Sequence, residues 1–238
     1  GDNIMALPKL NTQTFELNVP STDEKVKYRP FLVKEEKVLL QAQQSEKPEE
    51  MADALVQVIN NCTFNKINAA LLPSFDIEYI FLKIRSKSVG EKVDLMITCP
   101  DDNETKVKHT VDLSKVEVEV DEEHNNTISL TDNVSVIMSY PTIKTFQGAN
   151  LQSMNAEEII NLTGRCIYQI VDGVETYETK DLNSKDVDEF LENLTQDQFA
   201  KIQSFFTSMP RLKHEVKVTN PKTKKKGTVT LQGMQSFF

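Results

Sequence analysis

Glycine is scarce in this chain, and the motifs that depend on it are missing. The 238 residues include seven glycines, with no Gly-X-Ser-X-Gly, no phosphate-binding loop and no Gly-X-Gly-X-X-Gly. Such motifs need glycine because the backbone must turn sharply or approach a phosphate closely. The sequence therefore argues against a nucleotide-cradling loop and against a serine nucleophile of the hydrolase type.

Cysteine is also sparse, with Cys62, Cys99 and Cys166 widely separated. An odd, scattered set is typical of reduced thiols rather than of a disulfide framework. Cys62 and Cys166 fall on apolar helical stripes, so we expect both to be small buried side chains.

The sequence offers no catalytic constellation. The three histidines, His109, His124 and His214, show no ligand or triad spacing, and we expect them to be exposed in strands or turns. Paired carboxylates are common but fall on expected solvent faces, caps and turns, whereas acid–base catalysis needs a partly desolvated cleft. We predict that the protein is not an enzyme and has no catalytic residues, metal ligands or cofactor.

No apolar run approaches the roughly 20 residues that span a bilayer, and residues 1–10 lack the apolar core of a signal peptide. The formal net charge is −9 and the pI about 5.0. An acidic balance favours solubility and argues against general nucleic-acid binding. We predict no membrane partner.

The first third of the chain predicts a hairpin followed by three helices. Alternating residues 14–19 and 25–28 flank a turn-rich segment, which is typical of a β-hairpin. Helices are expected over 33–44, from Pro48 with an apolar stripe, and after Ser74 as N-cap.

The rest predicts strands and then helices. Alternation indicates strands within 93–140, and a long helix is expected from Asn155 through Ile170, with Gly173 as its C-cap. Two further helices follow the expected N-caps Ser184 and Thr195, and a closing hairpin occupies residues 214–231.

The predicted fold class is α+β, with helical bundle elements packed against antiparallel β-hairpins or a small sheet. Residues 1–141 are expected to hold the N-terminal hairpin, the three-helix unit and the strands. Residues 142–153 are a candidate linker, and residues 154–238 form a helical C-terminal part with the closing hairpin.

Two hairpin turns have the shape of a zinc-ribbon knuckle, in which Cys-X-X-Cys holds the ion. One begins Cys99-Pro100 and the other Asn220-Pro221. The first retains one cysteine and the second none, so neither can supply the thiolates of a tetrahedral site. We interpret them as degenerate zinc-ribbon-like hairpins or as ordinary X-Pro turns.

Two other features favour contacts with partners. Lys222, Lys224, Lys225 and Lys226 form a basic turn without aromatic residues for base stacking. A solvated turn, a contact with an acidic partner such as a second copy of this chain, and a nucleic-acid contact are the alternatives. The Phe237-Phe238 end packs on its own domain or docks into a partner.

Several segments together resemble the baseplate hub protein family of T4-like contractile-tailed bacteriophages. No single motif suffices; the order and spacing of the segments carry the resemblance, from Leu7 to Phe238. They are residues 29–40 (RPFLVKEEKVLL), 72–90 (LPSFDIEYIFLKIRSKSVG), the Cys99-Pro100 hairpin, Ser139-Tyr140-Pro141, residues 205–212 (FFTSMPRL), the basic hairpin and residues 233–238.

Members of that family often carry Cys-X-X-Cys at the hairpin turns, and this chain departs from the pattern at Asp102 and at Asn220-Pro221-Lys222. The resemblance implies a non-enzymatic protein of baseplate hub assembly, as structural subunit or assembly chaperone. It also implies other baseplate and hub proteins as partners, and the infected host cytoplasm or the virion tail as location. Residues expected to contact partners are Arg29, Phe31, Lys34, Glu35, Met209, Pro210, Arg211, Phe237 and Phe238.

Overall fold

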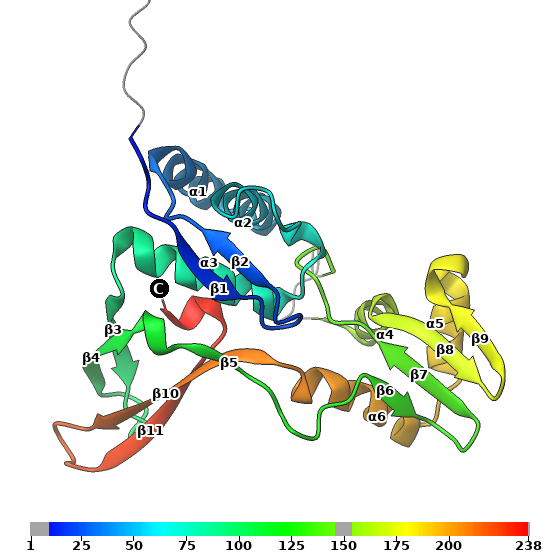
Figure 1. Ribbon diagram of the computed structural model, residues 1–238. Coiled ribbons are helices and arrows are strands. Elements are labelled where there is room, and N and C mark those ends of the chain that lie inside the picture. Colours follow the sequence, from blue (N-terminus) through cyan, green and yellow to red (C-terminus); the bar gives the residue numbers. More distant parts are fainter. Residues whose placement is uncertain (1–9, 146–153, 238) are drawn as a thin grey trace, which may run out of the picture.

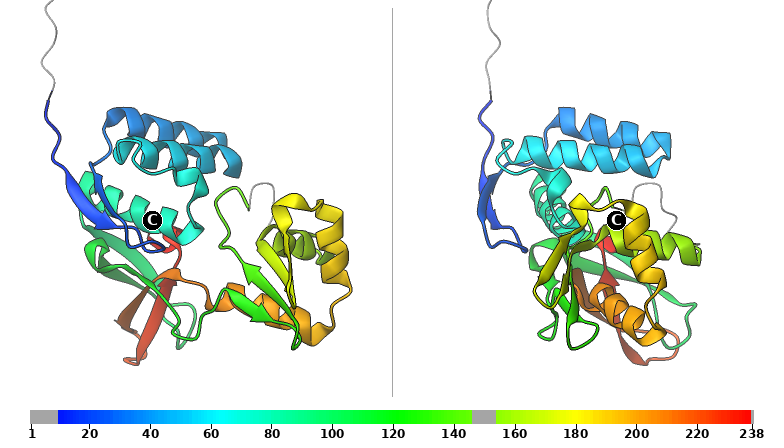
Figure 2. Two further views of the ribbon diagram at one scale, coloured as in Figure 1. Left: turned by 45° about the vertical axis from the view of Figure 1, so that its right-hand side comes forward. Right: turned by 90° about the vertical axis from the view of Figure 1, so that its right-hand side faces the viewer.

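The computed structural model describes residues 10–145 and 154–237. These residues form three units, each with its own apolar cluster. The first two units lie together, and the third projects from one side of them (Figures 1 and 2). Helices combine with small antiparallel sheets throughout, which confirms the predicted α+β class.

The first unit is the predicted hairpin with its three helices, and both predictions are confirmed. Pro48 occupies the first turn of its helix, where a missing N–H costs nothing. Leu55, Ile59 and Cys62 of that helix are buried against the hairpin and the third helix. The elements are β1 (Phe15–Asn18), β2 (Lys25–Tyr28), α1 (Val33–Ser45), α2 (Pro48–Cys62) and α3 (Ser74–Val89).

Helix α3 contributes to two apolar clusters. Ile80 and Ile84 pack in the first unit and Leu82 in the second. The N-cap of α3 is Pro73 rather than the predicted Ser74. Buried Asp76 in its first turn accepts a hydrogen bond from the Ser21 amide at 3.0 Å, which fastens the β1–β2 turn to the helix.

The second unit joins strands from both ends of the chain. Its three-stranded antiparallel sheet has the order β11-β10-β5, beside the β3–β4 hairpin. Leu82, Leu113, Leu212 and Phe237 are fully buried in its cluster. The elements are β3 (Lys92–Thr98), β4 (Lys106–Asp112), β5 (Glu117–Glu119), β10 (Arg211–Thr219), β11 (Lys226–Gln232) and the short 3-10 helix η4 (Met234–Phe237).

The third unit is a four-stranded antiparallel sheet, in the order β6-β7-β8-β9, packed with three helices. Val136, Ile202 and Phe205 are fully buried in its cluster. The elements are β6 (Thr127–Ser129), β7 (Val134–Met138), α4 (Ala156–Arg165), β8 (Ile167–Asp172), β9 (Glu175–Glu178), α5 (Ser184–Glu192) and α6 (Gln196–Ser208).

The predicted helix from Asn155 through Ile170 is wrong in its second half. Asn155 is indeed its N-cap, but the helix ends at Arg165, with Cys166 as C-cap. Residues 167–172 form β8 instead, and Gly173 (φ +58°) lies in the turn to β9. Isoleucines three residues apart fit a helical stripe, since a regular strand would place them on opposite faces. Residues 167–172 nevertheless pair with β7, and this pairing has a register irregularity between Ile137 and Met138.

The division at residues 142–153 stays a prediction. Two sheets join strands from either side of that segment, since β5 pairs with β10 and β7 pairs with β8. Residues 146–153 lie outside the described part of the chain.

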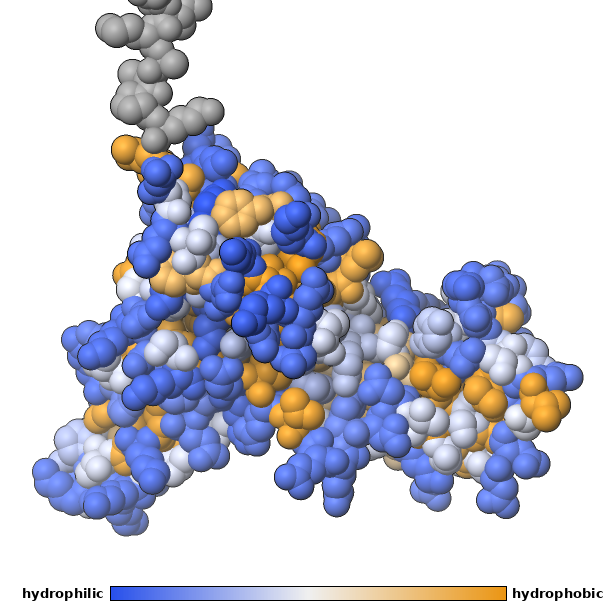
Figure 3. Space-filling model, viewed as in Figure 1, coloured by the Kyte–Doolittle hydropathy of each residue, from blue (hydrophilic) through white to orange (hydrophobic). Residues whose placement is uncertain are grey.

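The third unit is attached to the start of α3. The Ser74 amide donates to the Pro141 carbonyl at 2.9 Å, and Pro73 forms an isolated antiparallel bridge with Thr142. Phe75 and Tyr140 pack edge to face, with ring centroids 5.0 Å apart. On the face shown in Figure 3 the surface is mostly hydrophilic, with apolar side chains in separate groups.

Candidate functional site

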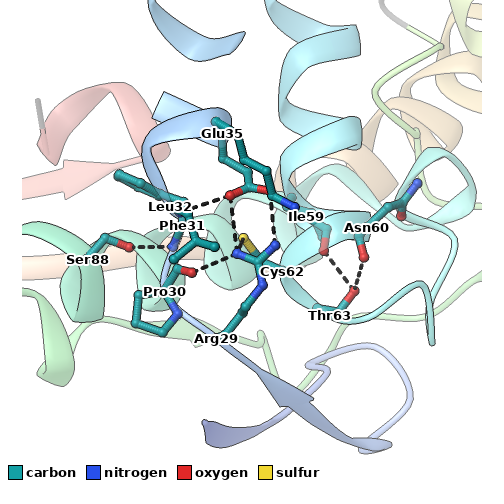
Figure 4. A network of polar contacts seen from close by, with 11 residues as sticks. Arg29, Pro30, Phe31, Leu32, Glu35, Ile59, Asn60, Cys62, Thr63 and Ser88 are labelled. Carbon is teal, nitrogen blue, oxygen red and sulfur yellow. Dashed lines mark hydrogen bonds and ion pairs between the residues drawn. The ribbon is translucent and has the colours of Figure 1, made fainter. Parts of the chain in front are cut away.

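Arg29 and Glu35, both predicted to contact partners, form a buried ion pair (Figure 4). The guanidinium donates Nη2 to Glu35 Oε1 at 3.0 Å and Nη1 to Oε2 at 3.2 Å. The side chains are 9% and 1% exposed. Each charge is therefore neutralised by two hydrogen bonds, which is what makes its burial tolerable.

The same carboxylate also caps α1. The Leu32 amide donates to Glu35 Oε2 at 2.9 Å, satisfying a donor that the helix start leaves free. Burial works against the charged form of Glu35. The hydrogen bonds from Arg29 and from the Leu32 amide outweigh burial, so the pKa of Glu35 lies below its ordinary value.

Neighbouring segments close around this pair. The Arg29 amide donates to the Cys62 carbonyl at 3.0 Å, and the Phe31 amide donates to Ser88 Oγ at 2.9 Å. Burial raises the pKa of the Cys62 thiol to about 11, so the thiol stays protonated. The network thus ties the end of β2 to α1, α2 and the last turn of α3.

Arg29 and Glu35 are therefore not surface residues in this fold, contrary to their predicted place in a partner contact. Their side chains pair with each other, and burying either charge without its partner would cost about 3–5 kcal/mol. Phe31 is half-buried against the first cluster. Lys34 is exposed, with Nζ 3.7 Å from Glu35 Oε1.

One face of α1 is both exposed and partly apolar. Val33 is 80% exposed and Leu40 50% exposed, on the side of the helix opposite Glu35 and Ala42, which are buried. Residues four or three apart along α1 share this side, which we call the outer face of α1: Val33, Lys37, Leu40 and Gln44.

The second predicted contact segment, Met209-Pro210-Arg211, connects α6 to β10. Met209 is the C-cap of α6 and is half-buried, and Pro210 is buried. Arg211 donates from Nη2 to the carbonyls of Phe206 at 3.0 Å and Thr207 at 2.6 Å. A cation there satisfies the free carbonyls at the helix end and suits the helix dipole.

Met209 and Arg211 line a groove of about 630 Å³ between the second and third units. We call it the junction groove. Lys213 in the groove pairs with Glu119 Oε2 at 2.9 Å. The four carboxylates of the groove come from one stretch of chain, so its wall on that side is acidic. Its lining is Glu119, Val120, Asp121, Glu122, Glu123, Thr207, Ser208, Met209, Arg211, Lys213 and Gln232.

His124, expected to be exposed, is half-buried next to this groove. Its Nδ1 lies 2.9 Å from Ser208 Oγ and its Nε2 lies 3.0 Å from Tyr140 Oη. The ring stacks on Tyr140, and the Phe205 ring packs at 5.1 Å. Burial lowers the pKa of His124, although Asp121 opposes this. The histidine connects the β5–β6 loop to α6.

Phe237, the third predicted contact, is fully buried in the second cluster. Of the two alternatives offered by the sequence, the Phe237 side chain therefore follows the first, packing on its own chain. Burying so large an aromatic ring stabilises the fold by roughly 2–3 kcal/mol. Phe238 lies outside the described residues.

The two knuckle-like turns lie against each other. We call residues 99–103 and 220–224 the paired turns. Asn220 Nδ2 donates to Asp101 Oδ1 and to Asp102 Oδ2, both at 2.9 Å. Ligand positions of a knuckle would be Cys99, Asp102, Asn220 and Thr223. One thiol, one carboxylate, an amide and a hydroxyl do not match the donors that zinc takes in such ribbons.

The two similar X-Pro turns could be recognised in the sequence, but nothing in the sequence indicated that they lie against each other. Sequence reasoning also missed the junction groove, whose walls come from segments about 90 residues apart. Within residues 10–145 and 154–237, no three side chains of His, Cys, Asp or Glu are grouped to hold a metal ion. In the same ranges no helix has the length and apolar character to cross a bilayer.

A comparison with known protein families finds a match that covers nearly the whole chain. The family described as T4 bacteriophage base plate protein matches residues 11–238. Neither the curated proteins nor the solved structures contain a significant match.

Proposed function

Since the chain belongs to the T4 bacteriophage base plate protein family, we propose that it acts in assembling the hub of a contractile-tail baseplate. It serves there as a hub subunit or as an assembly chaperone, through contacts with other baseplate proteins. The observation that carries the proposal is the extent of the family match, residues 11–238. Its place of action is the infected host cytoplasm and, if it is retained, the virion tail.

The contacts in the junction groove support binding rather than catalysis. Ser208 is held by His124, Arg211 by backbone carbonyls and Lys213 by Glu119. These three polar side chains thus each have a structural partner at hydrogen-bond distance. A role without catalysis, through surface contacts alone, fits these arrangements.

We place the main partner contact on the outer face of α1. Val33 and Leu40 expose apolar surface there, and Lys34 adds a charge at its edge. Apolar anchors with a charged rim are typical of protein–protein interfaces. Of the residues predicted from sequence, Lys34 lies at the edge of this surface, whereas Phe31 packs against the first cluster.

The junction groove is the second contact surface. Met209 and Arg211 lie in its lining, beside the carboxylates of Asp121, Glu122 and Glu123. The excess of carboxylates suits a basic segment of another baseplate protein, since complementary charge steers association and fixes orientation.

The first experiment follows the protein through a lysate of infected cells on a density gradient, with mass spectrometry of each fraction. Migration with finished tails identifies a structural subunit. Presence only in light fractions, together with hub precursors, identifies a released chaperone. Absence from both would overturn the proposed function.

A pair of variants tests the outer face of α1. Val33→Glu with Leu40→Glu should remove the protein from tail or precursor fractions, because the carboxylates would have to be desolvated in the contact. The matched control, Gln41→Glu with Gln43→Glu, adds the same charge to exposed positions on the flanks of α1. Equal behaviour of the two variants would place the contact elsewhere.

The sequence also suggested nucleic-acid binding through the basic turn as an alternative. The fold adds no support for it. Asp101 and Asp102 lie directly against that turn and offset part of its charge. A titration with duplex DNA would decide, because binding by counterion release weakens steeply as salt increases.

A further inference from the structure

The paired turns share one backbone geometry. In each, the first residue precedes proline, and its carbonyl accepts a hydrogen bond from the amide four residues on. These bonds are Asn103 N to Cys99 O at 3.0 Å and Lys224 N to Asn220 O at 2.9 Å. Asn103 and Lys224 both adopt left-handed conformations, with φ of +54° and +63°. Two such turns facing each other are the framework that holds zinc in a ribbon.

Side chains at two of the ligand positions satisfy the turn amides. Asn220 Oδ1 accepts from the amides of Lys222 at 2.8 Å and Thr223 at 3.3 Å. Asp102 Oδ1 accepts from the amides of Glu104 at 3.1 Å and Thr105 at 2.9 Å. In each turn, therefore, a side-chain oxygen satisfies the amides two and three residues further on.

The remaining atoms of these side chains bridge the two turns. The Asn220 amide nitrogen, on a residue only 1% exposed, donates to Asp101 and Asp102. Thr223 Oγ1 donates to Asp101 Oδ2 at 2.5 Å. The hydrogen bonds thus cross the space between the turns, where an ion would join them in a ribbon.

The close approach of the two hairpins is independent of these hydrogen bonds. A Cβ atom added to Gly227 would lie 2.5 Å from Cγ of Pro100. Cys99, next to Pro100, is fully buried.

We infer that the paired turns are the framework of a four-ligand metal site in which hydrogen bonds from Asn220 to Asp101 and Asp102 replace the ion. The positions of the four ligands are 99, 102, 220 and 223. The native chain is held together there without metal, and three substitutions would restore a zinc site. This inference does not depend on the proposed function.

The first test restores the ligands. The variant Asp102→Cys, Asn220→Cys, Thr223→Cys places four thiols at the framework positions. Two thiolates of a tetrahedral site lie about 3.8 Å apart, and the 2.9 Å contact between Asn220 and Asp102 shows that such positions can converge. We expect one Zn²⁺ per chain, and with Co²⁺ the absorption bands of tetrahedral thiolate coordination.

The matched control carries the same number of cysteines in or directly beside the same turns, at other positions: Asn103→Cys, Lys222→Cys and Lys225→Cys. The framework variant should bind Zn²⁺ at least about 100-fold more tightly than this control. If the framework variant does not fold alone, refolding it with and without Zn²⁺ gives the same answer. Equal affinities, or refolding that is indifferent to zinc, would overturn the inference.

The second test uses the native residues. Asn220→Ala should lower Tm by about 3–8 °C, from the loss of a buried bridging amide. Asn220→Asp should lower Tm further, because it sets a third carboxylate against Asp101 and Asp102. Asn133→Ala, at an exposed turn, is the control. A Tm of the native chain that falls with a chelator, or an Asp variant as stable as the native chain, would contradict the inference.

Discussion

The Arg29/Glu35 pair and the paired turns are both polar connections, but they differ in what they remove from water. The first buries two full charges within the first unit. The second buries a neutral amide, Asn220, while Asp101 stays exposed and Asp102 half-exposed. The comparison indicates that breaking a polar contact costs more stability when the remaining group is a buried charge. Such a charge has lost its partner and cannot turn to solvent.

The largest expected effect comes from breaking the buried pair at one side. Glu35→Ala should lower the free energy of unfolding by about 3–5 kcal/mol, because Arg29 stays buried without its partner and α1 loses its cap. Urea denaturation measures this loss. The control is Glu36→Ala, an exposed glutamate in the same turn, which should cost less than about 0.5 kcal/mol.

Removing both charges sharpens this result. Arg29→Met with Glu35→Leu should recover most of the stability that Glu35→Ala loses, since apolar residues of similar volume avoid desolvation. If the double variant is as unstable as the single one, hydrogen bonding rather than desolvated charge holds this site together.

The paired turns should respond less to an equivalent break. Gly227→Ala directs a methyl group at the Pro100 ring, 2.5 Å from Cγ, and the rigid ring cannot rotate away. We expect a loss of about 1–3 kcal/mol in the free energy of unfolding. Thr228→Ala, at the exposed neighbouring position, should change little. A neutral effect of Gly227→Ala would mean that the hairpins separate easily.

Acid titration, compared between the native chain and the double variant, gives a smaller effect that reports on the buried pair. The pKa of Glu35 is lowered in the folded state, so its contribution is complete above the unfolded pKa of about 4.3. It is lost as the pH falls through the lowered folded pKa. The stability of the native chain relative to the Arg29→Met, Glu35→Leu variant should therefore decline below about pH 4.3. A constant difference down to pH 3 would contradict the assignment.

The smallest expected effect relieves backbone strain in one turn. Lys224 has φ of +63°, a conformation that is less favourable for a residue with a Cβ atom than for glycine. Lys224→Gly should stabilise the chain by about 0.5 kcal/mol, after the added entropy of the unfolded chain. Asn103→Gly should gain less, because asparagine tolerates this conformation. Thermal unfolding of both variants would check the order.

Local patterns in the sequence were sufficient for much of the fold. The alternation around residues 14–28, Pro48 in a first helical turn and the cap at Thr195 all predicted elements that the structure contains. These signals act within one or two turns of chain. The candidate contact residues were harder to predict, because the exposure of a side chain depends on the tertiary packing around it.

What only the tertiary structure decided follows from contacts between distant segments. Residues 167–172 form a strand because they pair with β7, although their apolar spacing alone allowed a helix. Arg29 and Glu35 were expected from the sequence to contact partners, but contacts with α2 and α3 surround them in the fold. The two X-Pro turns were visible in the sequence, but their meeting across about 120 residues was decided by packing of the hairpins, which no local preference encodes.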